Sequence, residues 1–479
     1  MGASTASTDL DSSTGNSQGR VIVASLIGTS IEFFDFYAYA TAAVLVFPSL
    51  FFTGSDPSIA LLQSFAVFGV AFLARPLGSI LFGHFGDRIG RKATLVASLL
   101  TMGIATVLIG CLPTAHTPGW AVAAPALLTL LRFCQGLGLG GEWSGAALLA
   151  TENAPEGKRA IWGTFPQLGA PIGFILANVT FILMSYVLSA EAFASWGWRI
   201  PFLASALLVV IGLWVRLSLL ETPAFSKVVE QNEVLKMPVG AVFKRSWRPL
   251  LQGTFIMLAT YVLFYLMTAF TLTYGTSPAT ADAARAAAAK AGKPFNPDTF
   301  AAGLGYPRIT FLWMLIAGVV FFGIFTFVAG LLAERFGRRK MLLVVTAGIA
   351  VFGTLWVPLF SAGFAGAQAL LIIGFTLMGL TFGPMAAYLP ELFPSNVRYT
   401  GSAVSYNLAS VLGAALAPII AVWLWQQAHG SVIYVGLYLT GAAVITAIAL
   451  FLTHETRGLD YVDNVSGAQS GEVVAAEAP

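Results

Sequence analysis

Charged side chains are scarce in this sequence of 479 residues, in which Asp, Glu, Lys and Arg together account for 10%. Soluble domains carry roughly a quarter charged residues, whereas 57% of this chain is hydrophobic and its mean hydropathy is +0.80. This composition excludes a soluble enzyme, a secreted disulfide-rich domain and a disordered regulator. The formal net charge of +3 is spread over the whole length and leaves no basic face, so we expect no nucleic acid as a partner.

The residues and motifs of several kinds of chemistry are also missing. The two cysteines, Cys111 and Cys134, both fall in apolar runs, which argues against a disulfide framework and a metal site. The four histidines lie at the ends of apolar runs or in loops, so a proton relay inside a membrane has only carboxylates to use. There is no nucleophile–base pair and no phosphate-binding glycine loop, so we predict no cofactor, no use of ATP and no enzymatic activity.

What the chain has instead is long apolar runs, and about 20 such residues are enough for a helix to cross a lipid bilayer. These runs predict an all-α integral membrane protein with twelve transmembrane helices. The runs are 21–47, 59–83, 93–112, 121–150, 160–186, 200–219, 249–274, 308–332, 341–360, 368–390, 400–426 and 431–453.

Basic residues predict the orientation of these helices, because Lys and Arg are enriched in cytoplasmic loops. With a cytoplasmic N-terminus, the cytoplasmic segments hold 18 of the 25 Lys and Arg, Arg216 among them, and the opposite side holds five. Both termini are therefore predicted to be cytoplasmic. Residues 1–19 contain no Lys or Arg and so lack the basic start of a cleaved signal peptide. We expect disordered cytoplasmic tails at 1–19 and 454–479.

Two longer connections divide the chain. Residues 220–248 form a predicted cytoplasmic linker between six-helix bundles at 20–219 and 249–453. Residues 275–307 form a predicted extracytoplasmic loop, in which the Ala-rich stretch ATADAARAAAAKA favours one short helix.

The two predicted bundles repeat each other. Residues 83–92 read GHFGDRIGRK and residues 330–339 read GLLAERFGRR, and both fit G-x-x-x-[DE]-R-x-G-R-[RK]. Glu152 and Glu391 each begin E-x-x-P-x-x-x-R, and a weaker Glu-Thr pair starts at Glu221 and at Glu455. Matching motifs in corresponding positions predict two homologous six-helix halves. This architecture is typical of transporters, whose binding site lies between the halves near the bilayer midplane.

The same segments carry a family resemblance. The motif at 83–92 resembles the signature of the major facilitator superfamily. IEFFDF in span one, RFCQGLGLGGEW in span four and PELFPSNVRYTG before span eleven resemble the metabolite:proton symporter branch. The resemblance implies the major facilitator fold, a bacterial inner membrane, and substrates such as proline, betaine, α-ketoglutarate, citrate or shikimate carried with protons. It also implies that Arg132, with Gln135, belongs to a span-four motif associated with proton coupling.

Five ionisable residues lie well inside the predicted spans, where an unpaired charge is costly and is kept when it is paired or functional. They are Glu32, Asp35, Arg75, Arg132 and Glu142. A rise of about 1.5 Å per residue places Glu32, Asp35 and Arg132 near the midplane, so we predict that the acidic pair faces Arg132. Asp35 is the first candidate proton carrier and Glu32 the second. Arg75 and Glu142 have similar depths and form a candidate second pair, for gating or structure. The alternative for each pair is a permanent salt bridge between helices.

Polar groups in the middle of the spans are candidates for substrate binding. They could hydrogen-bond to an organic anion or zwitterion held by Arg132, although tyrosines on one helix face are as often interhelical packing. The candidates are Arg132, Gln135, Gln167, Tyr261, Tyr265, Thr268, Tyr406 and Asn407.

The charged loop motifs predict a latch at the cytoplasmic surface. A network of acids and bases there can hold the two halves together while the outer side is open, and breaking it permits the inward-open state. The alternative is a topology determinant with a tight turn. The predicted latch residues are Gly83, Asp87, Arg88, Gly90, Arg91, Lys92, Glu152, Arg159, Gly330, Glu334, Arg335, Gly337, Arg338, Arg339, Glu391 and Arg398.

Small residues on span four predict close helix packing. Gly136 and Gly140, like Gly141 and Gly145, are four residues apart, a spacing that lets two membrane helices approach closely.

The leading functional hypothesis is a secondary active transporter that couples proton flow to the symport of a small polar metabolite by alternating access. It would work as a monomer whose partners are the lipid bilayer, the metabolite and protons. A proton-coupled exporter is the alternative; residues 169–173 partly resemble a motif of drug antiporters but lack a glycine directly before Pro171. A non-transporting membrane sensor on the same fold is less favoured, because no appended soluble domain is seen to relay a signal.

Overall fold

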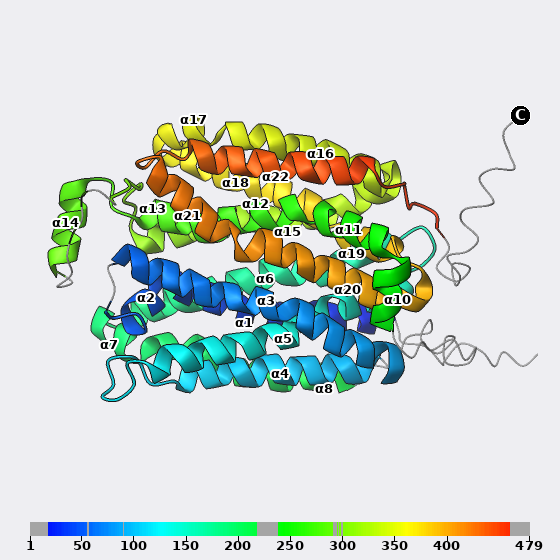
Figure 1. The fold of residues 1–479 in the computed structure, drawn as a ribbon, viewed down its shortest axis with the longest axis horizontal. Coiled ribbons are helices and arrows are strands. Elements are labelled where there is room, and N and C mark those ends of the chain that lie inside the picture. The colour runs from blue at the N-terminus through cyan, green and yellow to red at the C-terminus, as the bar shows by residue number, and fades with distance from the viewer. Residues whose placement is uncertain are drawn as a thin grey trace, which may run out of the picture.

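The structure is a computed structural model that describes residues 18–54, 57–89, 91–217, 238–290, 295, 297 and 300–459. These residues are almost entirely helical, and the long helices run side by side between two ends (Figure 1). Ten stretches of the described residues are long and apolar enough to cross a membrane. Neither α1 (Gln18–Leu45), which carries two carboxylates, nor α16 (Arg338–Thr354), which has 17 residues, belongs to that set, so the number of twelve spans stays a prediction.

The first half of the chain forms one bundle, drawn in blue to green in the lower part of Figure 1. After α1 its elements are α2 (Phe47–Leu50), α3 (Pro57–Ile89), α4 (Arg91–Cys111), α5 (Ala123–Glu152), α6 (Arg159–Val187), α7 (Ala190–Ser195), η1 (Gly197–Arg199) and α8 (Ile200–Leu217).

The second half forms the other bundle and has more interruptions. Its elements are α10 (Pro238–Arg245), α11 (Trp247–Ile256), α12 (Leu258–Tyr265), η2 (Leu266–Phe270), α13 (Thr271–Thr276), α14 (Ala281–Lys290), α15 (Arg308–Phe336), α16, α17 (Trp356–Ser361), α18 (Gly363–Phe382), α19 (Met385–Glu391), η4 (Ser395–Val397), α20 (Arg398–Ala409), η5 (Ser410–Ala415), α21 (Ala417–Gln427) and α22 (Ile433–Phe451).

The interruptions have local causes. Pro384 separates α18 from α19, because proline has no N–H to continue the helical hydrogen bonds. The segments η2 and η5 are single stretches of π-helix inside predicted spans seven and eleven, and π-helical turns are frequent at functional sites. Apolar periodicity does not reveal such breaks, so the predicted spans run through them, although Pro384 in span ten and Pro418 in span eleven permit bends.

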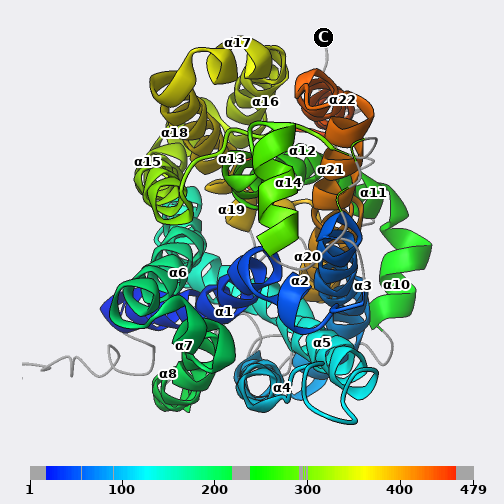
Figure 2. The ribbon, with the colours of Figure 1, turned by 90° about the vertical axis from the view of Figure 1, so that its left-hand side faces the viewer.

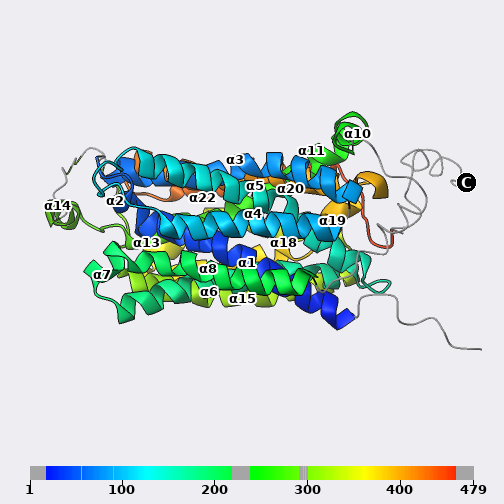
Figure 3. The same ribbon diagram turned by 90° about the horizontal axis from the view of Figure 1, so that it is seen from below.

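The two ends of the bundle differ. The first and last described helices, α1 and α22, begin and end at the end that also holds α10 (Figure 3). The positive-inside prediction makes this the cytoplasmic end. The opposite, outer end carries the Ala-rich helix α14, which the sequence predicted and which projects beyond the bundle (Figures 1 and 2). Residues 303–306 return from it and donate backbone hydrogen bonds to the end of α13 and the residues that follow it, each 2.9 Å long.

Glycines bring α3 and α5 into close contact, as the spacing on span four predicted. A Cβ atom on Gly136 would lie 2.2 Å from the carbonyl oxygen of Ala71, and one on Gly140 would lie 2.2 Å from that of Arg75. No side chain fits between these backbones, so α5 holds the part of α3 that carries Arg75 in place.

Candidate functional site

The five buried ionisable residues do not form the predicted pairs. Glu32 forms an ion pair with Arg216 of α8, and Glu142 of α5 forms an ion pair with the same guanidinium nitrogen. The predictions that Glu32 faces Arg132 and that Glu142 pairs with Arg75 are therefore wrong. Arg216 had been counted as a cytoplasmic loop residue, but its side chain is only 6% exposed. Side chains lean toward the N-terminus of their helix, so an arginine in the last turn of α8 extends back into the bundle.

Asp35 forms no ion pair with Arg132 among the described residues either; it interacts with the hydroxyl of Thr106, to which Gln135 donates. Its Oδ1 atom accepts a hydrogen bond from the Ser205 hydroxyl of α8, and within the described residues its Oδ2 atom has no hydrogen-bond partner. The side chain is completely buried. Asp35 thus remains a buried carboxyl group without an ion pair among the described residues, in keeping with its candidacy as a proton carrier.

The guanidinium of Arg132 is surrounded by aromatic rings and does not contact a carboxylate among the described residues. Its guanidinium carbon is 4.0 Å from the ring centroid of Tyr39, 4.6 Å from that of Phe36 and 4.8 Å from that of Phe68. One nitrogen donates to Gln135 Oε1, whose amide in turn donates to the Thr106 hydroxyl at 2.8 Å. Nε and Nη2 have no hydrogen-bond partner among the described residues.

Arg75 is the second guanidinium without a carboxylate. It stands 4.8 Å from the ring centroid of Phe72 and 5.0 Å from that of Phe36, so both arginines share the Phe36 ring. It is 3% exposed, and no ion pair to it is found within the described part of the chain. Its Nε atom has no hydrogen-bond partner there either. Stacking on aromatic faces stabilises a guanidinium only in part, so these rings alone do not compensate the buried charge of Arg75.

Arg75 lines a cavity between the two halves. The first half contributes Tyr37 and Arg75, and the second half contributes Tyr261, Tyr265 and Tyr406. Phenylalanine, methionine, alanine and threonine side chains line the remainder. The cavity has room for about 20 Å³, which is about one water molecule. The described conformation is therefore closed around its centre, and a metabolite needs the halves to separate before it can bind.

The predicted substrate residues divide into two groups in the structure. Tyr261, Tyr265 and Tyr406 line the central cavity, and the Tyr261 hydroxyl is buried without a hydrogen-bond partner among the described residues. Tyr406 stacks on Trp143 of the first half, with ring centroids 3.9 Å apart. Thr268 lines a neighbouring cavity of similar volume, but its hydroxyl donates to the backbone of its own helix.

Two of the three amide side chains predicted to bind substrate, Gln167 and Asn407, connect the two halves instead, whereas Gln135 bonds within the first half. Gln167 accepts a hydrogen bond from Trp143 Nε1 at 2.8 Å and donates to the Phe382 carbonyl oxygen at 2.8 Å. Asn407 donates to the Gly140 carbonyl oxygen at 2.8 Å, although its Oδ1 atom has no partner among the described residues. Depth along a span predicts neither the face nor the partner of an amide, because both depend on how each helix is rotated.

Further contacts close the cytoplasmic part of the interface. The Tyr399 hydroxyl donates to the Gly141 carbonyl oxygen, and the hydroxyls of Ser402 and Ser144 lie 3.2 Å apart. Glu334 Oε1 accepts a hydrogen bond from the backbone N–H of Ala160 at 2.5 Å, at the start of α6. A Cβ on Gly330 would lie 2.6 Å from Thr164, so α15 and α6 pack closely there. These contacts connect the first half to the second.

The second-half copy of the loop motif forms an ionic network. Arg338 pairs with Glu334 at 2.9 Å and lies 3.5 Å from Glu391, all three largely buried. Glu455, which sequence reasoning noted only as a repeat mark, accepts hydrogen bonds from the backbone N–H groups of Arg338 and Arg339 at 2.8 and 3.1 Å. A carboxylate there also balances the positive end of the α16 dipole.

The other predicted latch residues that the structure describes lie at the same end of the bundle. Arg335 is exposed, and Gly337 has a φ of +94° directly before α16. Arg159 donates a hydrogen bond to the Leu459 carbonyl oxygen. Arg398 donates one to the Phe393 carbonyl oxygen at 3.3 Å. Glu152 is half-buried at the end of α5. In the first-half copy, Gly83 packs against Thr400 and Lys92 donates to the Leu217 carbonyl oxygen at 2.8 Å. Gly90 and the side chains of Asp87, Arg88 and Arg91 lie outside the described residues.

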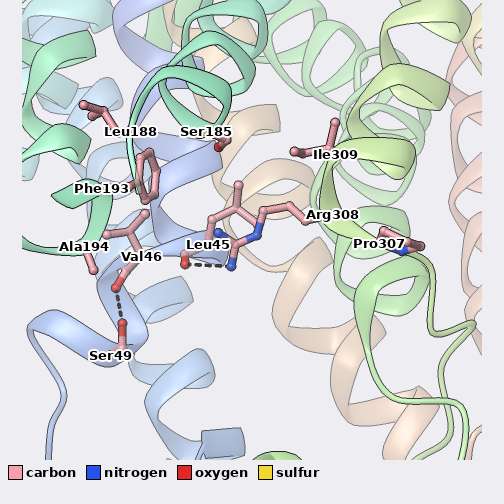
Figure 4. Close-up of a pocket in the computed structure, with 10 residues that line it drawn as sticks. All are labelled: Leu45, Val46, Ser49, Ser185, Leu188, Phe193, Ala194, Pro307, Arg308 and Ile309. Atoms are coloured by element: carbon pink, nitrogen blue, oxygen red, sulfur yellow. Dashed lines mark hydrogen bonds between the residues drawn. The ribbon is translucent and has the colours of Figure 1, made fainter. Parts of the chain in front are cut away.

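A larger cavity of about 540 Å³ lies between the halves at the outer end (Figure 4). Leu45, Ser49 and Ser185 line it from the first half, and Arg308 from the second. Arg308 Nη2 reaches across to the Leu45 carbonyl oxygen at 3.4 Å. The outer end is thus hollow where the cytoplasmic end is closed by hydrogen bonds.

Several known proteins are similar to this chain in sequence or in fold. The family model for "Sugar (and other) transporter" matches residues 20–237 and 297–463. The inner membrane metabolite transport protein YhjE of Escherichia coli is 56% identical over 444 residues, which are 92% of this chain and 95% of the relative. The shikimate transporter of Escherichia coli is 35% identical over 448 residues, or 91% and 95% of the two chains. The solved structure of the proton:xylose symporter XylE, bound to 6-bromo-6-deoxy-D-glucose, superimposes with a TM-score of 0.72 at 16% identity and covers 93% of this chain and 98% of that chain.

Proposed function

Because the chain belongs to the sugar (and other) transporter family of the major facilitator superfamily, we propose that it is a proton-coupled symporter of a small organic acid or zwitterion. The chain is a multi-pass inner-membrane transporter of metabolites and not an enzyme. Coupling to protons, the direction of transport and the class of substrate are the parts that we propose. A single chain suffices in this proposal, since both halves that line the cavity belong to it.

The observation that supports an anionic substrate most strongly is the position of Arg75. Its guanidinium is buried, lines the cavity between the halves and has no carboxylate partner among the described residues. A carboxylate of the metabolite would supply the missing charge and accept hydrogen bonds from the guanidinium. The hydroxyls of Tyr261, Tyr265 and Tyr406 would then bind the polar groups of the metabolite.

Asp35 is the proposed proton carrier. It is buried on α1, its Oδ2 atom is without a partner among the described residues, and no arginine is paired with it there. A carboxyl group that is free of a permanent ion pair can bind and release a proton as access to water alternates between the two sides.

Alternating access would use the contacts at the cytoplasmic end. Hydrogen bonds from Gln167, Tyr399 and Asn407 to backbone carbonyl oxygens of the opposite half close this end, while the outer end has a cavity of about 540 Å³. Loss of these bonds would let the halves rotate apart and open the site to the cytoplasm, a rigid-body change between two packed states.

The proposal is tested with purified protein in liposomes that contain a pH-sensitive dye. Proline, betaine, α-ketoglutarate, citrate and shikimate are added in turn to wild type and to Asp35→Asn. Symport predicts acidification of the lumen with one compound in the wild type and none in the variant. Asp282→Asn is the matched control, because that side chain is 94% exposed on α14 and should leave the signal unchanged.

Two outcomes contradict parts of the proposal. Equal acidification in wild type and Asp35→Asn would remove Asp35 as the carrier while leaving symport in place. Silence with every compound under an imposed gradient, together with alkalinisation on efflux from preloaded vesicles, would replace symport with proton-coupled export.

A further inference from the structure

We infer that Glu32, Glu142 and Arg216 form a second proton-binding site, separate from Asp35, in which the two carboxylates share one exchangeable proton. The use of this proton in a transport cycle rests on the proposed function, whereas its binding does not.

The cluster joins four helices of the first half around one guanidinium. Arg216 Nη2 contacts Glu32 Oε1 of α1 and Glu142 Oε1 of α5, and Nη1 donates to the Leu95 carbonyl oxygen of α4 at 2.6 Å. The exposed fractions of the three side chains are 6% for Arg216, 3% for Glu32 and 0% for Glu142. Gly28 makes room for the guanidinium, since a Cβ atom there would lie 3.1 Å from Nη2.

The charges in this cluster do not balance without a proton. Two ionised carboxylates and one guanidinium would leave one net negative charge on the cluster, which, among the described residues, only the more distant guanidinium of Arg75 would offset in part. An excess charge in the interior of a membrane helix bundle costs several kcal/mol. Binding of one proton to a carboxylate oxygen forms a carboxylic acid and makes the cluster neutral. Because both carboxylates contact the same nitrogen, the proton belongs to the pair and not to one residue.

The hydrogen bonds of Glu142 also favour a protonated cluster. Within the described residues no hydrogen-bond donor reaches Glu142 Oε2. A buried carboxylate oxygen without a donor is unfavourable when the group is ionised. Protonation of Glu142 lowers that cost, because a neutral carboxyl group is less costly to bury than an ionised one, and it leaves Glu32 and Arg216 as a neutral pair.

Other ionisable groups around the cluster are few. Arg75 interacts electrostatically with Glu32, and the Tyr399 hydroxyl of α20 interacts with Arg216 while donating to the Gly141 carbonyl oxygen. Asp35 lies one helical turn from Glu32 on α1 and is held by Ser205 of α8, while α4 contributes the Leu95 carbonyl oxygen. The Tyr406 hydroxyl of α20 also interacts electrostatically with Glu32, but it carries no positive charge. Among these groups Arg75 alone can offset the negative charge, so an anion bound to Arg75 would favour uptake of the proton by the cluster.

Infrared spectroscopy of the purified protein in lipid tests the site without knowledge of the substrate. A protonated carboxyl group has a C=O stretching band that an ionised carboxylate lacks and that shifts on H/D exchange. Glu142→Gln and Glu32→Gln should each abolish one such band at neutral pH, because the remaining carboxylate is neutralised by Arg216. Arg216→Met should increase the area of the band about twofold, because two carboxyl groups are then protonated.

Control variants distinguish a proton in this cluster from a proton on Asp35, and a protonated cluster from one that is permanently ionised. Asp35→Asn should leave the cluster band in place, and Glu191→Gln, a variant of an exposed glutamate on α7, should change nothing. If neither Glu142→Gln nor Glu32→Gln removes a carboxylic acid band, the cluster is a permanently ionised clamp and the inference is overturned. Two glutamine variants are used so that a folding defect in one leaves the other to decide. Absence of dye acidification in liposomes would instead count against the proposed function and leave the infrared result standing.

Discussion

At the scale of single residues, the proposed anionic substrate depends on Arg75 more than on any other described group. It is buried at the interface of the halves and stacks on Phe36 and Phe72 without an ion pair among the described residues. We expect Arg75→Gln to lower uptake of the transported metabolite about 30-fold or more, because a charge-assisted interaction in a dry site is worth roughly 2–5 kcal/mol. Arg75→Lys should keep part of the activity, since the charge remains but the planar fork is lost.

Uptake of radiolabelled metabolite into the liposomes measures this difference. Arg285→Gln is the matched control, because its side chain is 64% exposed on α14. An Arg75→Gln variant with wild-type KM would show that the carboxylate binds elsewhere, and Arg132 would then be the remaining buried guanidinium without a carboxylate among the described residues.

At the scale of elements, the contact between α3 and α5 positions this arginine. The Gly140 Cα lies against the backbone of Arg75, and an added Cβ would be 2.2 Å from the Arg75 carbonyl oxygen. We expect Gly140→Ala to destabilise the protein by about 1–3 kcal/mol, because overpacking forces backbones apart. The displaced α3 should also weaken transport. Thermal unfolding of the purified protein in detergent, followed by tryptophan fluorescence, measures the loss.

Gly441→Ala supplies the comparison on α22. An added Cβ there has no neighbour within 4 Å, so this variant should be neutral or slightly more stable because alanine favours helix. Equal melting temperatures for the two variants would show that the α3–α5 contact yields easily and does not hold Arg75.

At the scale of the whole molecule, the cytoplasmic hydrogen bonds between the halves hold the described closed conformation. Glu334 bridges them, because it accepts from the Ala160 N–H of the first half and pairs with Arg338 of the second. We expect Glu334→Ala to shift the equilibrium toward the inward-open state about tenfold or more, since a hydrogen bond to a charged group contributes about 1.5–3 kcal/mol.

Spin labels at exposed Lys158 and Lys340, in a background without Cys111 and Cys134, report the separation of the two halves at this end. The population of long distances should rise in Glu334→Ala and stay unchanged in Glu156→Ala, whose glutamate is exposed at the same end. An unchanged distribution in Glu334→Ala would mean that the remaining contacts, such as those of Gln167 and Asn407, hold the closed state without it.

The sequence by itself determined that this is a helical membrane transporter built from two similar halves. Apolar run length, the sign of loop charges and repeated motifs are local properties, and a helix in lipid must satisfy its own backbone hydrogen bonds wherever it packs. The sequence also identified five of the buried charges, but it placed Arg216, whose side chain is buried, in a cytoplasmic segment. Tertiary structure alone decided their partners. Glu32 and Glu142 meet at Arg216, and Arg75 faces an aromatic cavity, because partners depend on the rotation of each helix about its axis and on its neighbours. Depth along a span carries no information about either, so residues at equal depth on α1 and α5 were paired in the prediction although their side chains face different helices.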